Sequence, residues 1–406
     1  MTRRLVTFDF HLAGPVVLIA ALLFPLSAYS QDANTPEIVV IGEIQGAANT
    51  VSSFLKHLDL VDADLRWSEG DTILIQTGDI MDRGEKVRST LDLFMRLQEE
   101  AAAAGGRVIV LMGNHEAMNL FGELRDVNYM AYAAFAGSDS AERQQQGWKE
   151  WVEWKIRRAD AVGETFVADE DTKAEWFAVH PPGWMEYVES MRPEGIYGAW
   201  LRTLPVAVEI DDVLFIHAGI SPAMKGTDVE SINRKAAAEI HGFDEDRALM
   251  VAEGLILPTS SVREMIEVIN EEATSINGLD ASQRTPGNPR VARLLEVQDI
   301  REWGSWSVLT DKGPLWFRGT SQWPENQHGT EMAAILDASG VERMVTGQSN
   351  GKEHLIHSRF DDRVLLTSID MSDDPYAGGG NPAALAITNG DYFVVTNGGR
   401  ELLIDN

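Results

Sequence analysis

The sequence predicts an α/β fold in which parallel strands alternate with helices. Between residues 37 and 116, short runs of β-branched and apolar residues alternate with longer helix-like segments, which is the pattern of consecutive βαβ units. Each strand of this run ends in a polar turn that contains glycine: GEIQG, GDIMDRG and GNHE. Because the carboxyl ends of parallel strands meet at one edge of a sheet, we expect these turns to form one site.

The elements of this first run follow from the same patterns. The Ile, Leu and Val content and the closing glycines indicate the strands, and the longer segments between them indicate helices. In chain order we predict a strand over 38–41, a helix over 50–58, a strand over 72–76, a helix over 86–103 and a strand over 107–111.

A polar, helix-like insertion over about residues 117–204 then interrupts the alternation and contains six of the eleven tryptophans. Trp148, Trp151, Trp154 and Lys155 lie at helical spacing within it. We interpret this stripe as a packing surface rather than as a platform for substrate.

The second half of the chain returns to strands. AVEIDDVLFIHAG predicts two strands around an Asp211–Asp212 turn, and a helical stretch over Val229–Asn277 follows. Further strands are predicted in ERMVTGQS and DRVLLTSIDM, and the chain finishes in a hairpin around Asn389–Gly390. We therefore expect a single domain over 31–406, with helical insertions at about 117–204 and 222–302.

The first thirty residues have the pattern of an export signal. Arg3 and Arg4 precede an apolar run from Leu12 to Leu26, and AYS supplies small residues for cleavage after Ser30. The alternative is a retained membrane anchor, but prolines interrupt the run and it is short for a span. We predict a periplasmic or secreted protein with no stable membrane insertion after the signal is removed. The absence of cysteine excludes a lipid-anchored lipoprotein and a disulfide scaffold.

The composition is strongly acidic. Asp and Glu total 63 against 34 Lys and Arg, a net charge of −29. Such a surface repels nucleic acid and anionic membranes, so we expect no nucleic-acid partner. An anionic substrate has to be captured by a local cluster of arginines.

Three polar side chains follow separate predicted strands. Asp79 lies in the turn TGDIMDRG, Asn114 in MGNHE and His217 in FIHAG. A carboxylate and an amide oxygen at neighbouring strand ends can share a divalent cation, and one Asp can bridge two cations about 3.5–4 Å apart. Each residue alone is a weak indication, but together, in this order, they predict a metal site.

The motifs GDIMDRG, GNHE, HAG and GQS, following GEIQG, resemble the ordered motif set of the calcineurin-like metallophosphoesterases. GIYGAWLRTLP, PLWFRG and SIDM resemble the Shewanella-like branch of the phosphoprotein phosphatases, and the resemblance covers about residues 38–371. It implies a four-layer αββα sandwich, two β-sheets flanked by helices, with two metals at the strand ends. By this resemblance Asp79 bridges the metals, and Asn114 and His217 are ligands of the second metal.

The other three ligand positions depart from the family's pattern. Glu43 stands where Asp is expected, Gln45 where His is expected, and Gln348 where the last His is expected. Amide oxygens in place of imidazole nitrogens suit hard ions. We therefore expect the cofactor to be a divalent metal, Mn or Mg rather than Zn or Fe, and leave its occupancy open.

The resemblance also assigns catalytic residues. His115 is the general acid that protonates the leaving oxygen, and Asp82 orients it. Arg83 and Arg318 match the family's phosphate-binding arginines, and Arg202 is a further candidate. Guanidinium groups suit this role because they hold two phosphate oxygens at once.

Three functions remain open on the sequence. The first is a metal-dependent phosphatase that hydrolyses phosphomonoesters, with a phosphorylated small molecule or a phosphoprotein as substrate. The second is a pseudophosphatase that binds a phosphorylated ligand through its arginines without cleaving it. The third is a scaffold that contacts another protein through its acidic surface or its helical insertion. The ligand changes lie in the metal set alone, which favours altered metal chemistry over general erosion of the site.

Overall fold

The structure, a computed structural model, describes residues 35–296, 303–348, 356–367, 369, 371 and 381–405. The predicted export signal lies outside these residues, as do Ser349 of the GQS motif and Ser368 and Asp370 of the SIDM motif. The chain divides into two compact units, Met1–Thr35 and Pro36–Asn406, and both sheets belong to the second. None of the helices formed by the described residues is long and apolar enough to cross a bilayer.

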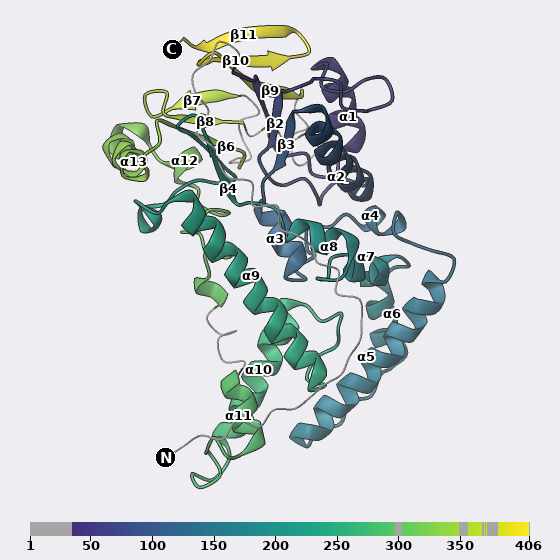
Figure 1. Cartoon of the computed structure of the whole chain (residues 1–406). Helices are drawn as coiled ribbons and strands as arrows, with labels where there is room; N and C mark the ends of the chain where they lie inside the picture. Colours follow the sequence, from purple (N-terminus) through teal and green to yellow (C-terminus); the bar gives the residue numbers. More distant parts are fainter. Residues whose placement is uncertain are drawn as a thin grey trace, which may run out of the picture. The chain divides into compact units, whose positions relative to one another are not determined.

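Two sheets form the centre of the second unit (Figure 1). The first sheet has the strand order β11-β10-β9-β1-β2-β3, and the second has the order β4-β5-β6-β8-β7. The strands of the first are β1 (Ile38–Ile41), β2 (Ile73–Gln76), β3 (Arg107–Val110), β9 (Ala383–Thr388), β10 (Asp391–Thr396) and β11 (Gly399–Ile404). The strands of the second are β4 (Ala207–Ile210), β5 (Val213–Ile216), β6 (Arg343–Thr346), β7 (His357–Arg359) and β8 (Val364–Leu366).

The strands that carry the polar turns are parallel, as predicted. β1 pairs with β2 and β2 with β3 in parallel register in the first sheet, and β5, β6 and β8 are parallel in the second. Antiparallel strands flank both parallel sets. The turns that follow β1, β2, β3, β5 and β6 therefore leave the sheets from carboxyl strand ends.

The alternation of side chains along β1 explains the layers. Ile38 and Val40 lie in the core between the two sheets, which they share with Phe215 of the second sheet. Val39 and Ile41 point to the other face and pack in the core that contains α1 and α2. This pattern, buried on both faces, is what a strand in the middle of a sandwich requires.

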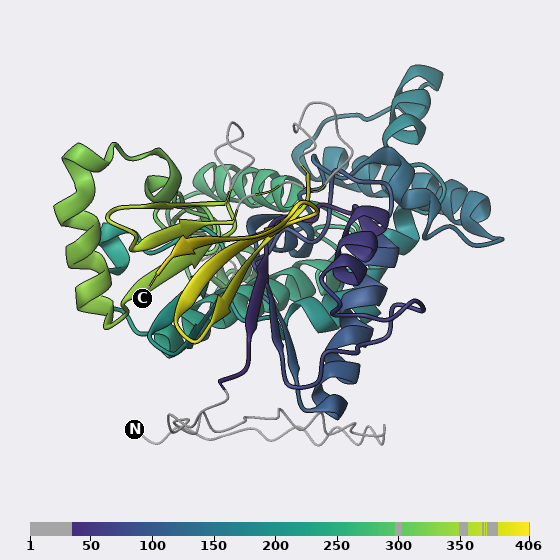
Figure 2. The same ribbon diagram turned by 90° about the horizontal axis from the view of Figure 1, so that it is seen from above.

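Helices cover the outer face of each sheet. Those on the first are α1 (Ala48–His57) and α2 (Val87–Ala104), and α12 (Gly319–Gln322) and α13 (Glu325–Ser339) lie beside the second. Met332, Ile335 and Leu336 of α13 pack on Leu214 and Met344 of the second sheet. Figure 2 shows the purple helices and the green helices on opposite sides of the strands. The four-layer αββα sandwich is thus confirmed.

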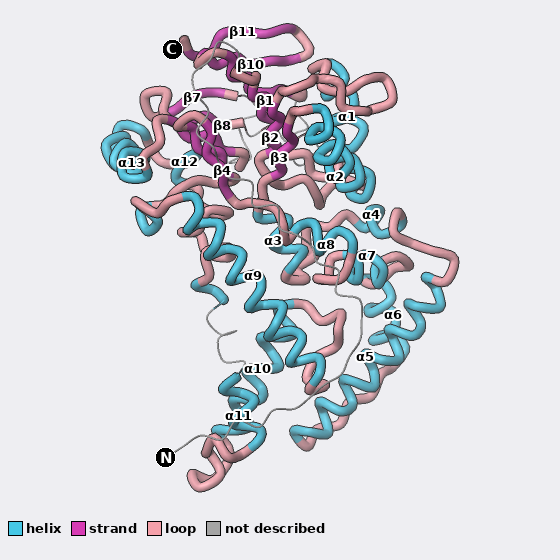
Figure 3. The backbone as a smooth tube through the Cα atoms, in the orientation of Figure 1, coloured by secondary structure: helices cyan, strands magenta, loops and turns pink. Residues whose placement is uncertain are grey.

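Two helical insertions leave the sandwich. The first contains α3 (Asn114–Leu120), α4 (Tyr129–Ala133), α5 (Ser140–Val162), α6 (Glu170–Val179), α7 (Trp184–Ser190) and α8 (Ile196–Leu201). The second contains the 3₁₀ turn η1 (Pro222–Met224), α9 (Val229–Ala252), α10 (Val262–Asn277) and α11 (Pro289–Glu296). In Figure 3 the strands gather in one region, and these insertions consist of helix and loop.

The tryptophan stripe of α5 is used for packing. Trp154 is buried and its indole Nε1 donates to the carbonyl of Leu255 at 2.8 Å, which joins the first insertion to the second. Trp148 stacks on Trp151 at 5.4 Å and meets Trp176 of α6 at 5.7 Å. Large aromatic surfaces of this kind bury much apolar area, so the stripe holds the insertions together.

The helical stretch predicted over Val229–Asn277 is helical at both ends, and it consists of α9 and α10. The stretch is two helices, because the chain turns at Gly254, whose φ is 66°, and α10 starts again from a capping box in which Ser261 and Glu264 bond each other's backbone N–H groups. β7 and β11 were missed.

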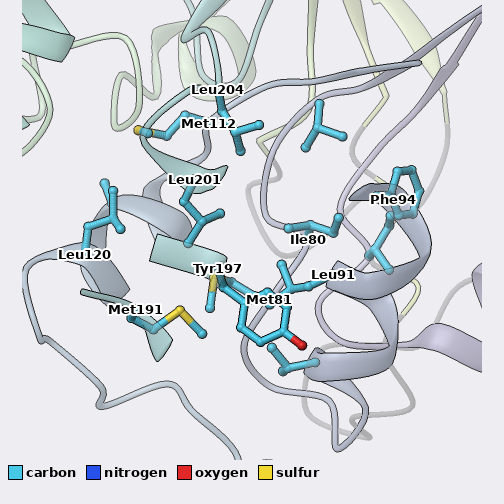
Figure 4. Packing of buried hydrophobic residues seen from close by; sticks show 14 of the residues in the cluster. Ile80, Met81, Leu91, Phe94, Met112, Leu120, Met191, Tyr197, Leu201 and Leu204 are labelled. Carbon is cyan, nitrogen blue, oxygen red and sulfur yellow. The ribbon is translucent and has the colours of Figure 1, made fainter. Parts of the chain in front are cut away.

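Figure 4 shows the first insertion packing against the turn that follows β2. Tyr197 and Leu201 of α8 lie with Ile80 and Met81 in one buried cluster. The hydroxyl of Tyr197 donates to Asp92 of α2 at 2.7 Å. The apolar residues Ile80 and Met81 of the GDIMDRG turn are therefore anchored in this core.

Candidate active site

The turns after β1 and β2 are bonded to each other. The backbone N–H groups of Ile44 and Gln45 donate to the carbonyl of Asp79 at 3.0 and 2.9 Å, and that of Gly46 donates to Ile80 at 3.0 Å. Gln45 and Asp79 both have positive φ angles, 50° and 58°. Non-glycine residues adopt this conformation at a cost of about 1–3 kcal/mol each, and it is concentrated at functional sites.

Glu116 holds the Asp79 turn in this conformation. Its Oε2 accepts from the backbone N–H groups of Asp79 and Gly113, both at 2.7 Å, and its Oε1 accepts from Ile80 at 2.9 Å. One buried carboxylate thus satisfies donors from two strand ends at once. Glu116 was not among the predicted site residues, although it is the last residue of the GNHE motif.

Gly78 allows the strand ends to come this close. Its φ is 93°, and a Cβ atom there would lie 2.7 Å from the Cα of Gly113 and 2.8 Å from Nδ1 of His217. A side chain at this position would push the turns after β2, β3 and β5 apart, so glycine is required for the site to form.

The side chains of Asp79, Asn114 and His217 lie close together at the strand ends. Nδ1 of His217 donates to the carbonyl of Thr77 at 2.8 Å, and burial lowers the pKa of this histidine, so its Nε2 carries a lone pair. That Nε2 lies 2.9 Å from Oδ1 of Asn114 and 3.5 Å from Oδ1 of Asp79. Three acceptors without a proton between them suit a cation, so these residues fit one metal ion.

At the three substituted ligand positions, the glutamine amide nitrogens turn toward neighbouring oxygens. Nε2 of Gln45 donates to Oε2 of Glu43 at 3.0 Å, and Oε1 of Gln45 is buried with no hydrogen-bond partner among the described residues. Gln348 donates through Nε2 to Asn114 at 3.2 Å, and its Oε1 is also buried without a partner. Among the residues that the structure describes, no three His, Cys, Asp or Glu side chains are arranged as a metal-ligand set.

His115 and Asp82 form a buried pair. Nδ1 of His115 donates to Oδ2 of Asp82 at 2.8 Å, and Nε2 lies 3.8 Å from Oδ2 of Asp79. Burial by itself lowers the pKa of His115. The charge of Asp79 and the hydrogen bond to Asp82 outweigh that effect and raise the pKa to about 10. The imidazole therefore holds a proton at neutral pH, as a general acid must.

A chain of hydrogen bonds supports this pair from the first insertion. Nδ2 of Asn119 donates to Oδ1 of Asp82 at 2.7 Å, and the hydroxyl of Tyr187 in α7 donates to Oδ1 of Asn119 at 2.6 Å. All four side chains, including His115, are buried. Tyr187 and Asn119 were missed by the sequence analysis; the only local indication was that Asn119 lies one helical turn after His115, and its amide indeed donates to the His115 carbonyl at 2.9 Å.

The three predicted phosphate-binding arginines have different surroundings. The charges of both Arg83 and Arg318 act on Asp79, and that of Arg318 also acts on Glu43, so both cations lie near the strand-end carboxylates. Burial lowers the pKa of Arg318 and those carboxylates oppose the shift.

Arg202 lies in a different environment. Its Nε and Nη2 donate to the two carboxylate oxygens of Asp244 at 2.7 Å each, and Nη1 donates to the carbonyls of Met191 and Gly198. Its donors are therefore used to join α8 to α9. The structure gives Arg202 a structural role in place of the predicted phosphate contact.

The site combines three polar side chains that could hold a cation, a buried histidine with a raised pKa and two nearby arginines, at the carboxyl ends of strands from two packed sheets. The family model of the calcineurin-like phosphoesterases matches residues 36–269, which include most of these turns. The chain belongs to this family. Members of the family are phosphoester hydrolases that use divalent metals.

Relatives of this phosphoesterase carry names that agree with the predicted branch. Shewanella-like protein phosphatase 2 of Arabidopsis thaliana is 26% identical over 319 residues, which cover 78% of this chain and 79% of that protein. Shewanella-like protein phosphatase 1 of Plasmodium berghei is 25% identical over 204 residues, 50% of this chain and 44% of that protein. The crystal structure of a cold-active protein-tyrosine phosphatase from a psychrophilic Shewanella matches with a TM-score of 0.55 at 20% identity, over 91% of this chain and 81% of that one, and supports the fold.

Proposed function

We propose that this phosphoesterase is a phosphatase that hydrolyses phosphomonoesters through an altered, oxygen-rich metal site. The observation that carries the proposal is the buried pair of His115 and Asp82, whose hydrogen bond through Nδ1 leaves the Nε2 of His115 3.8 Å from Oδ2 of Asp79. The raised pKa of His115 supports its role as an acid. The name of the Arabidopsis relative makes phosphoproteins a substrate class to test.

The residues of this chain would divide the work as follows. Arg83 and Arg318 hold the phosphoryl oxygens and stabilise the charge that grows on them. His115 donates its Nε2 proton to the departing alkoxide, while Asp82 fixes the ring through Nδ1 and stabilises its charged form. Asn119 donates a hydrogen bond to the Asp82 carboxylate and so holds it in position against the imidazole ring.

Asp79, Asn114 and His217 would hold the metal. When bound, a divalent cation supplies Lewis-acid polarisation of a phosphoryl oxygen. The amide oxygen of Asn114 and the carboxylate of Asp79 favour Mn²⁺ or Mg²⁺. Together with the predicted export signal, this chemistry fits a periplasmic or secreted phosphatase acting on a phosphorylated small molecule or a phosphoprotein.

A pseudophosphatase is the second candidate, and a specific observation favours it. Gln45 bonds to Glu43, and Gln348 bonds to Asn114, so neutral amides engage groups that would otherwise face a metal. In this alternative the arginines bind a phosphorylated ligand that is not cleaved.

Hydrolysis of para-nitrophenyl phosphate separates the two candidates. The purified protein is assayed with Mn²⁺, Mg²⁺, Ca²⁺ or Zn²⁺ in turn, beside Asp79→Asn and beside Asp64→Asn, which makes the same change at an exposed position. We expect metal-dependent turnover that is lost in Asp79→Asn and kept in Asp64→Asn. Turnover no greater than that of Asp79→Asn with every ion would contradict the phosphatase. A melting temperature that rises with phosphate, and no longer rises in Arg83→Ala, would then support the pseudophosphatase.

A further inference from the structure

A cavity of about 600 Å³ lies between the two helical insertions, apart from the strand-end site. Its walls come from the end of α3 and the loop after it, from α7, from α9 and from the start of α10. None of the predicted metal ligands lines it. Its volume falls within the range of small-molecule sites, which is about 300–1,000 Å³.

Four arginines line this cavity in a chain whose net charge is −29: Arg125, Arg192, Arg247 and Arg263. Two carboxylates also line it, but both are engaged. Glu123 accepts from Nε of Arg263 at 2.9 Å and lies 3.9 Å from Nη1 of Arg125, and Glu264 caps α10 through the backbone N–H of Ser261 at 2.8 Å. The walls therefore carry positive charge that their own carboxylates do not balance.

Arg192 and Arg247 supply that charge. Nε of Arg192 is buried without a hydrogen-bond partner in the described part of the chain. Arg247 donates through Nη2 to the carbonyls of Pro258 and Ser260, at 2.8 and 3.1 Å, and its nearest acidic influences are Asp244 and Glu264. Burial lowers the pKa of Arg247 to about 10, and the charge of Arg192 contributes to the shift. Glu189 and Glu194 offset part of the charge of Arg192. The two guanidinium groups still repel each other, and an anion bound between them would relieve that repulsion.

Apolar and aromatic side chains line the same cavity. Trp184 and Val188 of α7 are buried and present apolar surface, and Leu120 lies at the end of α3. His180 stacks on Trp176 at 4.2 Å, and burial lowers its pKa, so this wall is neutral. A ligand that fits has an anionic end and an apolar body.

We propose that this cavity is a second binding site, which takes a small organic anion with a phosphate or carboxylate group held by Arg192 and Arg247. The apolar part of the ligand packs on Trp184 and Val188. Asn119 lines the cavity and donates to Asp82, so the bound anion lies next to the support of the acid pair rather than at the phosphate position.

Calorimetric titration with phenylphosphonate, which has an anionic group on an aromatic ring and is not hydrolysed, tests this site. The titration is made in Arg83→Gln protein with EDTA, so that binding at the strand-end site is suppressed. The titration is repeated with the double variant Arg83→Gln/Arg192→Gln. The matched control is Arg83→Gln/Arg157→Gln, because Arg157 is an exposed arginine on α5 with the same charge. Arg192→Gln is expected to fold, since its Nε has no partner to lose.

We expect phenylphosphonate to bind the Arg83→Gln protein and its dissociation constant to rise at least tenfold with Arg192→Gln. The control Arg157→Gln is expected to leave it unchanged. Equal affinity with and without Arg192, or no binding to the Arg83→Gln protein at all, would overturn the proposal. Should Arg192→Gln fail to fold, Arg192→Lys replaces it, and it too has to weaken binding, because a lysine cannot hold two oxygens in a fork.

Discussion

Replacing Tyr187 with phenylalanine tests whether the first insertion supports the acid pair. The change removes one hydroxyl and leaves Oδ1 of Asn119 buried without its donor, which lies at 2.6 Å in the native protein. Leaving a buried acceptor unsatisfied costs about 1–3 kcal/mol, and no large cavity is created because only the oxygen is lost. We therefore expect the free energy of unfolding in urea to fall by about 1–3 kcal/mol. Turnover is also expected to fall, because Asn119 becomes free to rotate away from Asp82.

Tyr132→Phe is the control for this substitution. Tyr132 is buried and meets the ring of Tyr187 edge to face at 5.2 Å, but its hydroxyl is not part of the chain to Asp82. We expect Tyr132→Phe to lower the free energy of unfolding less than Tyr187→Phe does. Its turnover is expected to stay close to that of the native protein. If Tyr187→Phe is no more destabilising than Tyr132→Phe and keeps full turnover, the positioning chain has been misinterpreted.

Three further predictions follow from the site. Arg202→Met should lower the free energy of unfolding by about 2–4 kcal/mol, because it leaves the largely buried Asp244 without its partner. KM should stay the same. A raised KM with unchanged stability would instead show that Arg202 binds phosphate. His115→Asn should lower kcat about 10²–10⁴-fold, more for alkyl phosphates than for nitrophenyl phosphate, whose leaving group needs no proton; an equal loss on both would exclude an acid. The metal site is tested by restoring the family's ligands together, Glu43→Asp, Gln45→His and Gln348→His. This variant should bind Zn²⁺ or Fe and turn over faster, as followed by metal analysis and phosphate release, and no gain would show that the geometry is not that of the family.

The parallel strands of the fold could be predicted because the information is local. Each strand over residues 37–116 is a short apolar run closed by glycine, and β1 was predicted at its observed bounds, Ile38–Ile41. β7 and β11 were missed because they lack such a run. β7 is His-Ser-Arg, and the first four residues of β11 are exposed, so neither edge strand shows buried alternation.

The strand-end residues of the site could be predicted for the same reason, since the turns follow their strands directly. The residues that support them could not. Arg202 and Asp244 are 42 positions apart, and Tyr187 and Asn119 are 68 apart, so their pairing depends on how the helices of the insertions pack. Glu116 was overlooked although it lies within the GNHE motif itself. Its carboxylate accepts from backbone N–H groups, and the identity of the side chains around it does not indicate such contacts.

The number of metal ions bound per chain tests the central claim most directly. The acceptors around His217 Nε2 suit one ion, whereas Glu43 is bonded to Gln45. Equilibrium dialysis against Mn²⁺ should therefore give one ion per chain, lost in Asp79→Asn, in a preparation that hydrolyses para-nitrophenyl phosphate. A stoichiometry of two ions per chain would contradict the altered metal site. A protein that binds no ion and shows no turnover would contradict the proposal of a phosphatase.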